Sequence, residues 1–226
     1  MLEILRTKSQ DLYGFSRSSQ EVSTEAKPVS EAQTSILRQI SEILKSSEFQ
    51  QKIKKGQITF AMIKPNLRIT NSDLTDEEVA EQLKKDIALE SPRVNGLEII
   101  FELPLPFTFE RVESFYAGVK DKLLNLPAAQ VNDHHFPNRW EMFKYIMAQG
   151  MATFLILHSP QGNAVNKWRQ LIGPTFPSLI PSDESWKLRS RFTDLNNGIH
   201  GSDSIDSVHE EIKWFASQLE QITKDI

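Results

Sequence analysis

The sequence predicts an α/β protein in which helices cover a sheet. Three observations predict this class: apolar runs with the length and residue types of strands, apolar stripes at helical spacing, and a composition suited to a packed core. Hydrophobic residues make up 39% and charged residues 25% of the chain. Strand and helix patterns are mixed from Gly56 onward, and no internal repeat is visible. The order of these patterns suggests one sheet with helices packed on it.

Length and charge restrict the class of protein further. A chain of 226 residues suits one ordinary domain plus an appendage. Its net charge of −4 argues against general nucleic-acid binding, which needs a basic surface. There is no cysteine, which excludes disulfides, thiolate metal sites and cysteine nucleophiles. No segment has the apolar length of a membrane span, so we expect no membrane partner and a cytoplasmic location.

The first 55 residues differ from the rest of the chain. We expect residues 1–55 to form an N-terminal extension, partly disordered and then helical, and residues 56–226 to form the main domain. The stretch from Thr7 to Ser35 is mostly polar and weakly periodic. It is followed by apolar residues at helical spacing, which predict an amphipathic helix: Ile36, Leu37, Ile40, Ile43, Leu44, Phe49 and Ile53. We expect this helix to dock on its own domain or on a neighbouring subunit, without a chemical role.

The remaining elements follow from residue periodicity. Strands are predicted at Ile58–Lys64, at Leu97–Leu105 and at Ala152–Leu157. Helices are predicted at Thr108–Leu124, Pro137–Gly150 and Gln161–Leu171, and over a segment that carries Val79, Leu83 and Ile87. Ser72 or Asp73 could cap this last segment.

The last helix places one carboxylate. Apolar residues step by three and four and form one stripe: Ile205, Val208, Ile212, Phe215, Leu219 and Ile222. At about 100° per residue, Glu211 falls roughly 60° from the centre of the stripe, and Glu210 points away from it. We therefore expect Glu211 to be partly buried, where a carboxylate could accept one imidazole N–H and orient the ring. The alternative is a glutamate at the rim that pairs with a surface lysine.

A candidate for that imidazole lies just upstream, in the octet from Asn197 to Ser204. His200 stands between Gly198 and Gly201 on a predicted turn, directly before the last helix. Taken alone, such a histidine is as well explained by a turn or core role as by catalysis. The octet nevertheless resembles the signature of the nucleoside diphosphate kinase family, in which the histidine is phosphorylated during turnover.

Other motifs extend the resemblance over about the last three-quarters of the chain. They are Phe60-Ala61-Met62-Ile63-Lys64-Pro65, Phe115-Tyr116, the run Asn163–Arg169 followed by Gly173-Pro174-Thr175, and Leu188-Arg189-Ser190-Arg191-Phe192. Glu211 lies eleven residues after His200 and Asn197 three before it, as in the family. The resemblance implies that His200 and Glu211 are catalytic. It implies nucleotide-binding roles for Lys64, Tyr116, Trp140, Arg169, Thr175, Arg189 and Asn197.

The resemblance also implies a fold and an activity. The fold would be ferredoxin-like, with an antiparallel four-stranded sheet covered by helices. The activity would be transfer of the γ-phosphoryl group of a nucleoside triphosphate to a nucleoside diphosphate, by a ping-pong mechanism through phosphorylated His200. Mg²⁺ would be carried on the nucleotide phosphates, with no metal ligand from the protein, and the chain would form a homo-oligomer.

These residue types suit phosphoryl transfer. Arg169 and Arg189 would offer planar, permanently charged forks for phosphate oxygens, and Lys64 and Thr175 would add a cation and a hydroxyl donor. The sequence has no glycine-rich phosphate loop, so side chains would have to hold the phosphates.

Several features depart from the family pattern. Asn66-Leu67 replaces the usual Asp-Gly, the segments on either side of Tyr116 are longer, and Phe176 stands where asparagine is common. The aromatic residue that stacks on the base could be Trp140 or Phe136, and we prefer Trp140.

Each motif also has a plain structural interpretation. Arg189 and Arg191 could form a solvated basic patch, Lys64 could end a strand, and Tyr116 could be a core residue. Two alternatives to the kinase therefore stay open: a nucleotide-binding or scaffold module with weak catalysis, and a protein-histidine phosphotransferase or nuclease. We expect His134-His135 to lie in a surface loop rather than to bind a metal, since adjacent side chains diverge.

Overall fold

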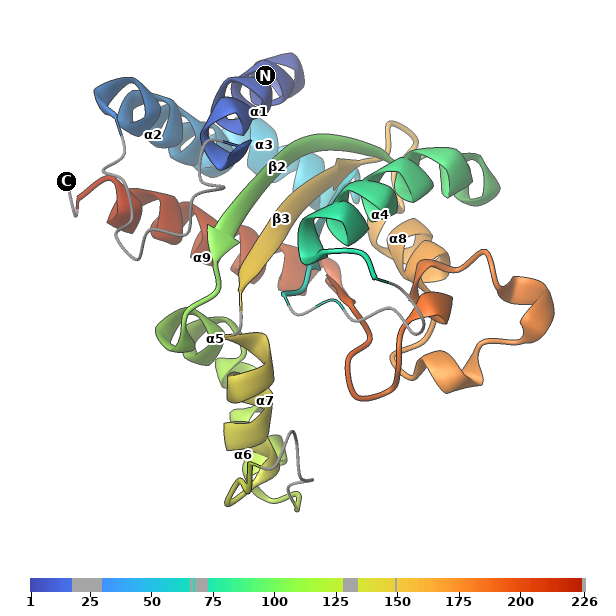
Figure 1. Cartoon of the computed structure of the whole chain (residues 1–226). Coiled ribbons are helices and arrows are strands. Elements are labelled where there is room, and N and C mark those ends of the chain that lie inside the picture. The colour runs from blue at the N-terminus through green and yellow to red at the C-terminus, as the bar shows by residue number, and fades with distance from the viewer. Residues whose placement is uncertain (18–29, 66, 68–72, 128–133, 149, 225–226) are drawn as a thin grey trace.

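A four-stranded antiparallel sheet forms the centre of the protein (Figure 1). The computed structural model describes residues 1–17, 30–65, 67, 73–127, 134–148 and 150–224. The strands lie in the order β2 (Glu98–Pro106), β3 (Met151–His158), β1 (Ile58–Ile63) and β4 (Ile199–Gly201). The predicted fold class, an antiparallel four-stranded sheet covered by helices, is confirmed.

Both faces of the sheet are buried, which explains why its central strands are continuously apolar. Phe60 and Met62 of β1 face one core, while Ala61 and Ile63 face the other. In β3, Phe154 and Ile156 face the first core and Leu155 and Leu157 the second. Because successive side chains of a strand point to opposite faces, a strand between two helical layers needs apolar residues at every position.

The first layer contains the N-terminal helices and the last helix. It consists of α1 (Leu2–Arg17), α2 (Glu31–Lys45), α3 (Ser47–Lys54) and α9 (Ile205–Ile222). The predicted amphipathic helix is confirmed as α2 and α3. The stretch from Thr7 to Ser35, predicted to be loose or partly helical, is helical where α1 covers it, and residues 18–29 lie outside the described residues. The boundary between extension and domain at residues 55 and 56 stays a prediction.

The second layer consists of α4 (Asp76–Glu90) and α8 (Ala164–Ile172), with the short 3₁₀ helices η1 (Ser91–Val94) and η5 (Leu188–Arg191). The N-cap of α4 is Thr75, rather than the predicted Ser72 or Asp73. Thr75 and Glu78 form a reciprocal capping box, which satisfies two backbone N–H groups that the first turn leaves open.

The helix predicted over Thr108–Leu124 is broken. It consists of α5 (Phe109–Phe115), the 3₁₀ turn η2 (Ala117–Val119) and α6 (Lys120–Leu124). Glycine disfavours a helix interior because ordering it costs more backbone entropy, and Gly118 lies in the turn that interrupts this one. Together with α7 (Arg139–Met147), these segments project from one end of the sheet (Figure 1).

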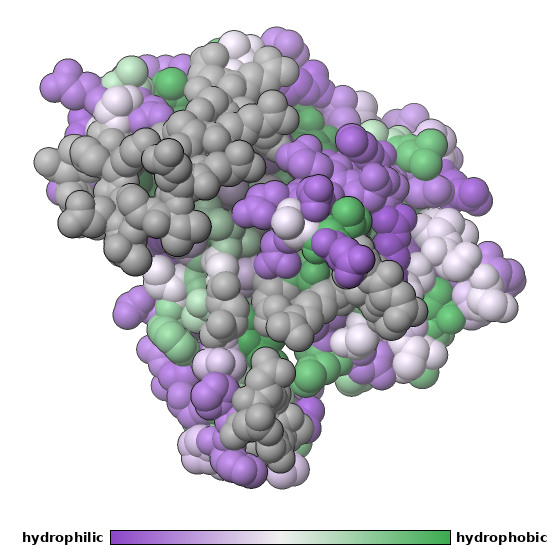
Figure 2. Space-filling view, in the orientation of Figure 1, coloured by the Kyte–Doolittle hydropathy of each residue, from purple (hydrophilic) through white to green (hydrophobic). Residues whose placement is uncertain are grey.

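Two further 3₁₀ helices lie between α8 and η5, in the segment that connects β3 to β4. They are η3 (Pro177–Leu179) and η4 (Ser182–Glu184). Hydrophilic residues dominate much of the face shown in Figure 2, with hydrophobic ones scattered among them. Within the described ranges, no helix combines the length and apolar character needed to cross a membrane.

Candidate active site

The strand that carries His200 is shaped by two glycines. β4 is an edge strand, and His200 lies opposite Met62 of β1. Gly198 has a φ of 69°, and a Cβ there would lie 2.6 Å from the Phe192 ring. A Cβ at Gly201 would lie 2.3 Å from Nε1 of Trp168. Gly198 is therefore required for its backbone conformation and because a side chain would overlap the Phe192 ring. Gly201 is required because Trp168 approaches it closely.

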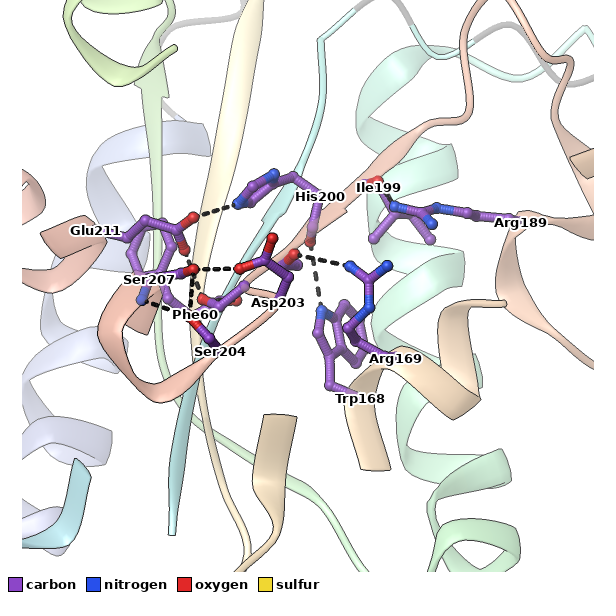
Figure 3. A network of polar contacts seen from close by, with 12 residues as sticks. Phe60, Trp168, Arg169, Arg189, Ile199, His200, Asp203, Ser204, Ser207 and Glu211 are labelled. Atoms are coloured by element: carbon purple, nitrogen blue, oxygen red, sulfur yellow. Dashed lines mark hydrogen bonds and ion pairs between the residues drawn. The ribbon is translucent and has the colours of Figure 1, made fainter. Parts of the chain in front are cut away.

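The carboxylate of Glu211 orients the imidazole of His200. His200 Nε2 lies 2.9 Å from Glu211 Oε1, and the Ser202 hydroxyl donates to Glu211 Oε2 at 2.5 Å (Figure 3). The Ser202 backbone N–H donates to the Phe60 carbonyl at 3.2 Å, which ties this contact to the sheet. The predicted contact between Glu211 and His200 is confirmed. Because Nε2 is engaged, Nδ1 is the ring nitrogen available for a substrate.

Two aromatic rings flank the imidazole. The ring centroid of Phe115 is 5.1 Å from that of His200, and the centroid of Tyr116 is 5.9 Å away, both in edge-to-face arrangements. The Tyr116 hydroxyl is buried and has no hydrogen-bond partner among the residues described. Burial raises the pKa of this phenol far above its usual value, with the nearby Glu211 carboxylate adding to the shift. Tyr116 therefore keeps its proton and can act as a hydrogen-bond donor.

The two predicted arginines lie along the outer edge of β4. Arg169, from α8, donates from Nη1 to the carbonyl of Gly201 at 3.4 Å. Arg189, from η5, donates from Nη2 to the carbonyl of Ile199 at 2.7 Å and from Nη1 to that of Gly173 at 2.9 Å. The two guanidinium groups therefore hold the carbonyls on either side of His200 (Figure 3).

Lys64 and the arginines concentrate positive charge beside His200. Burial, together with the charge of Arg169, lowers the pKa of Arg189 to about 10, so the guanidinium is still charged at neutral pH. Burial, together with the charge of Arg189, lowers the pKa of Lys64 to about 7. Arg189 therefore lies within coulombic range of both Lys64 and Arg169. Positive charge gathered in this way favours a bound anion.

The lysine is held by the segment that precedes His200. Lys64 Nζ donates to Asn197 Oδ1 at 2.7 Å, and Asn197 Nδ2 donates to the carbonyl of Thr175 at 2.9 Å. The structure thus brings together eight of the nine residues predicted for the site: Lys64, Tyr116, Arg169, Thr175, Arg189, Asn197, His200 and Glu211.

The ninth predicted residue, Trp140, lies in the core of the projecting helices. It is 1% exposed, and its ring stacks against Phe143 with centroids 6.1 Å apart. Phe143 in turn contacts Tyr116, at 4.8 Å between centroids. A base could stack on Trp140 only if α7 moved, so its role stays a prediction.

Sequence reasoning missed two residues that support His200. Ser202 holds the second oxygen of Glu211, and Trp168 Nε1 donates to the His200 carbonyl at 3.4 Å. Ser202 could have been found from strand periodicity, since residues 200 and 202 share a face. Trp168 carried no local signal, because its partner is 32 residues away.

The described residues contain no cluster of three histidine, aspartate or glutamate side chains that could hold a metal ion. His134 and His135 are both exposed, as predicted. Mg²⁺ prefers oxygen ligands and is often bound largely through substrate phosphates and water.

The site places a histidine held by a carboxylate beside three basic side chains, and comparisons with known proteins show the family of this chain. The model of the nucleoside diphosphate kinase family matches residues 57–220. The chain is 30% identical to the nucleoside diphosphate kinase of Pasteurella multocida over 125 residues, which cover 55% of this chain and 77% of that protein. It is 26% identical to that of Wolbachia pipientis subsp. Culex pipiens over 130 residues, which cover 57% and 79%.

A solved structure agrees in fold. The nucleoside diphosphate kinase of Aquifex aeolicus superposes with a TM-score of 0.51 at 20% identity, covering 70% of this chain and 94% of that one. This chain belongs to the nucleoside diphosphate kinase family.

Proposed function

We propose that this protein is an active nucleoside diphosphate kinase that works by a ping-pong mechanism through His200. The observation that carries the proposal is the geometry of the imidazole. Glu211 engages Nε2, and Nδ1 is left free on the strand whose flanking carbonyls are held by Arg169 and Arg189, with Lys64 near Arg189. A nucleophilic nitrogen next to an anion-binding site is what phosphoryl transfer requires.

In the first half-reaction, Nδ1 attacks the γ-phosphorus of the triphosphate. A nitrogen–phosphorus bond forms, the bond from phosphorus to the bridging oxygen breaks, and the diphosphate leaves with that electron pair. A second diphosphate then attacks the phosphorylated histidine by the reverse course. Glu211 stabilises the positive charge that develops on the ring, while Arg169, Arg189 and Lys64 neutralise charge on the phosphate oxygens.

The remaining predicted residues would position the nucleotide. Thr175 would donate its hydroxyl to a phosphate, Asn197 would bind the sugar hydroxyls, and the Tyr116 hydroxyl would donate beside the transferred group. Trp140 would contact the base after a movement of α7. Mg²⁺ bound to the phosphates would add charge neutralisation when present.

A labelling experiment tests the proposal. Purified protein is incubated with γ-labelled ATP and Mg²⁺, and the protein-bound label is tested for acid lability and for transfer to GDP. We expect His200→Ala to lose labelling completely. The matched control is His209→Ala, because His209 lies on α9 and contacts Gln50 of α3, away from Glu211.

The outcomes separate the kinase from its alternatives. Label that is lost only as inorganic phosphate would favour a defective transferase. Nucleotide binding without labelling would favour a scaffold, and normal labelling of His200→Ala would exclude the proposed mechanism. A homo-oligomer and a cytoplasmic location stay predictions, and light scattering of the purified protein tests the first.

A further inference from the structure

The short helix η5 presents Arg189 to the site and has little internal structure to fix its orientation. It spans only the four residues Leu188–Arg191. Residues two apart in a 3₁₀ helix point about 240° apart around its axis. Arg189 and Arg191 therefore point in different directions, and rotation of η5 about its axis would change which of the two faces β4.

Contacts on the other residues of η5 set this rotation. Arg191 forms an ion pair with Oδ2 of Asp86, which lies in the middle of α4. Asp86 is 6% exposed, and its other oxygen, Oδ1, accepts a hydrogen bond from Gln82 at 3.0 Å. Leu188, three residues before Arg191 and therefore on the same side of η5, is fully buried in the core beneath α4 and α8.

The ion pair is poorly explained as a source of stability alone. Removing charges from water costs about as much as their attraction returns, so a buried pair often adds little net stability and is a candidate for specifying geometry. Asp86 joins η5 to a helix 105 residues earlier in the chain, and it occupies the guanidinium that would otherwise compete with Arg189 for an anion.

We propose that Asp86 is a positioning residue: by holding Arg191 against α4, it fixes the rotation of η5 that directs Arg189 onto the edge of β4. This inference rests on the proposed nucleotide-binding role of Arg189. In this proposal Asp86 does not contact the substrate. The effect of Asp86 on nucleotide binding should pass entirely through Arg189.

The first test measures Mg-ADP affinity by calorimetry and kcat/KM for phosphoryl transfer in Asp86→Asn and Arg191→Gln. Misplacement of a phosphate-binding group by about 1 Å can cost up to about a hundredfold in rate. We expect both variants to lose at least about tenfold in kcat/KM and in affinity. Glu90→Gln is the matched control: Glu90 is also a carboxylate of α4 paired with an arginine, Arg93 of η1, and its substitution should leave both quantities unchanged.

The second test separates positioning from general destabilisation. In an Arg189→Ala background, Asp86→Asn should have no further effect on affinity, because coupled residues give non-additive changes. Circular dichroism checks that each variant is folded, and Arg191→Gln provides the same test if Asp86→Asn does not fold.

Unchanged affinity and rate in folded Asp86→Asn and Arg191→Gln would overturn the inference, as would a full additional loss in the Arg189→Ala background. Failure of the proposed function looks different, because the unmodified protein would then transfer no phosphate, whether or not it binds Mg-ADP.

Discussion

Nucleotide binding should weaken as the pH rises above 7, because Lys64 loses its proton. Burial and the nearby Arg189 lower the pKa of the Lys64 ammonium to about 7. Only the charged amine attracts phosphate, so the apparent Kd is the intrinsic Kd divided by the protonated fraction. That fraction predicts a Kd about elevenfold weaker at pH 8, and about a hundredfold weaker at pH 9, than for the fully protonated amine.

Isothermal calorimetry of Mg-ADP binding between pH 6.5 and 9 measures this effect. A bound phosphate raises the pKa of the amine, so binding near pH 8 should also take up close to one proton, seen as a dependence of the binding enthalpy on buffer. Lys64→Met is the control: it should bind more weakly at pH 6.5 and lose most of the pH dependence. An unmodified protein with constant Kd across this range, or a variant with the same slope, would refute the reasoning.

The same pKa predicts an effect on stability, with a sign that can be checked. The pKa of Lys64 is about 7 in the folded protein and 10.5 without burial. Between these values the unfolded chain binds more protons, so the Lys64 contribution to the free energy of unfolding rises with pH. Lys64→Met should therefore stabilise the protein more at pH 6 than at pH 10, as measured by urea denaturation.

Three further predictions concern the support of the site and the sheet. Glu211→Gln should slow phosphorylation of His200 by about tenfold to a hundredfold in single-turnover assays, because the carboxylate no longer stabilises the positive ring; an unchanged rate would remove Glu211 from the mechanism. Gly201→Ala should lower the free energy of unfolding by about 1–3 kcal/mol or more, since its Cβ would lie 2.3 Å from Trp168 Nε1; an unaltered urea midpoint would contradict the close packing. Ser9→Ala should cost about 1–3 kcal/mol, because the hydroxyl accepts the Glu102 N–H at 3.1 Å and donates to its carbonyl at 2.9 Å on the edge of β2. Hydrogen exchange of the Glu102 amide should then accelerate, and equal exchange in both proteins would count against the contact.

Local periodicity was enough to place Glu211. The stripe of α9 is buried from Val208 to Leu219, with Ile212 and Phe215 in the core, and Glu211 lies partly exposed beside it. Ile205, predicted to begin the stripe, is exposed in the first turn of the helix. A helix has one geometry, so the direction of each side chain follows from its position in the sequence. Strands β1, β2 and β3 were predictable for the same reason, to within one residue at their ends. The turn predicted around His200 was wrong: Ile199–Gly201 form the short edge strand β4, because they pair with β1, and three residues between glycines carry too little apolar alternation to predict a strand.

Long-range contacts could not be predicted in this way. The ion pair between Asp86 and Arg191 depends on how α4 packs against η5, which no local period encodes. The carbonyl partners of Arg189 were equally hidden, because a backbone carbonyl has no sequence signature. The break at η2 was missed because the apolar spacing continues across it, although the backbone does not remain helical.

The partners of the arginines explain how the site can be ordered before a ligand arrives. Each terminal nitrogen of Arg189 carries two N–H groups and gives one hydrogen bond to a backbone carbonyl, of Gly173 or Ile199. The Nε of Arg189 is buried and donates to no partner among the described residues. A guanidinium fixed by β4 therefore keeps N–H groups that no described protein atom occupies, and because Arg189 is only 4% exposed, a phosphate would reach them only after neighbouring side chains move aside. Under the proposed function, the contacts to Gly173 and Ile199 would hold these donors in place, and donors that need little reorganisation stabilise developing charge best.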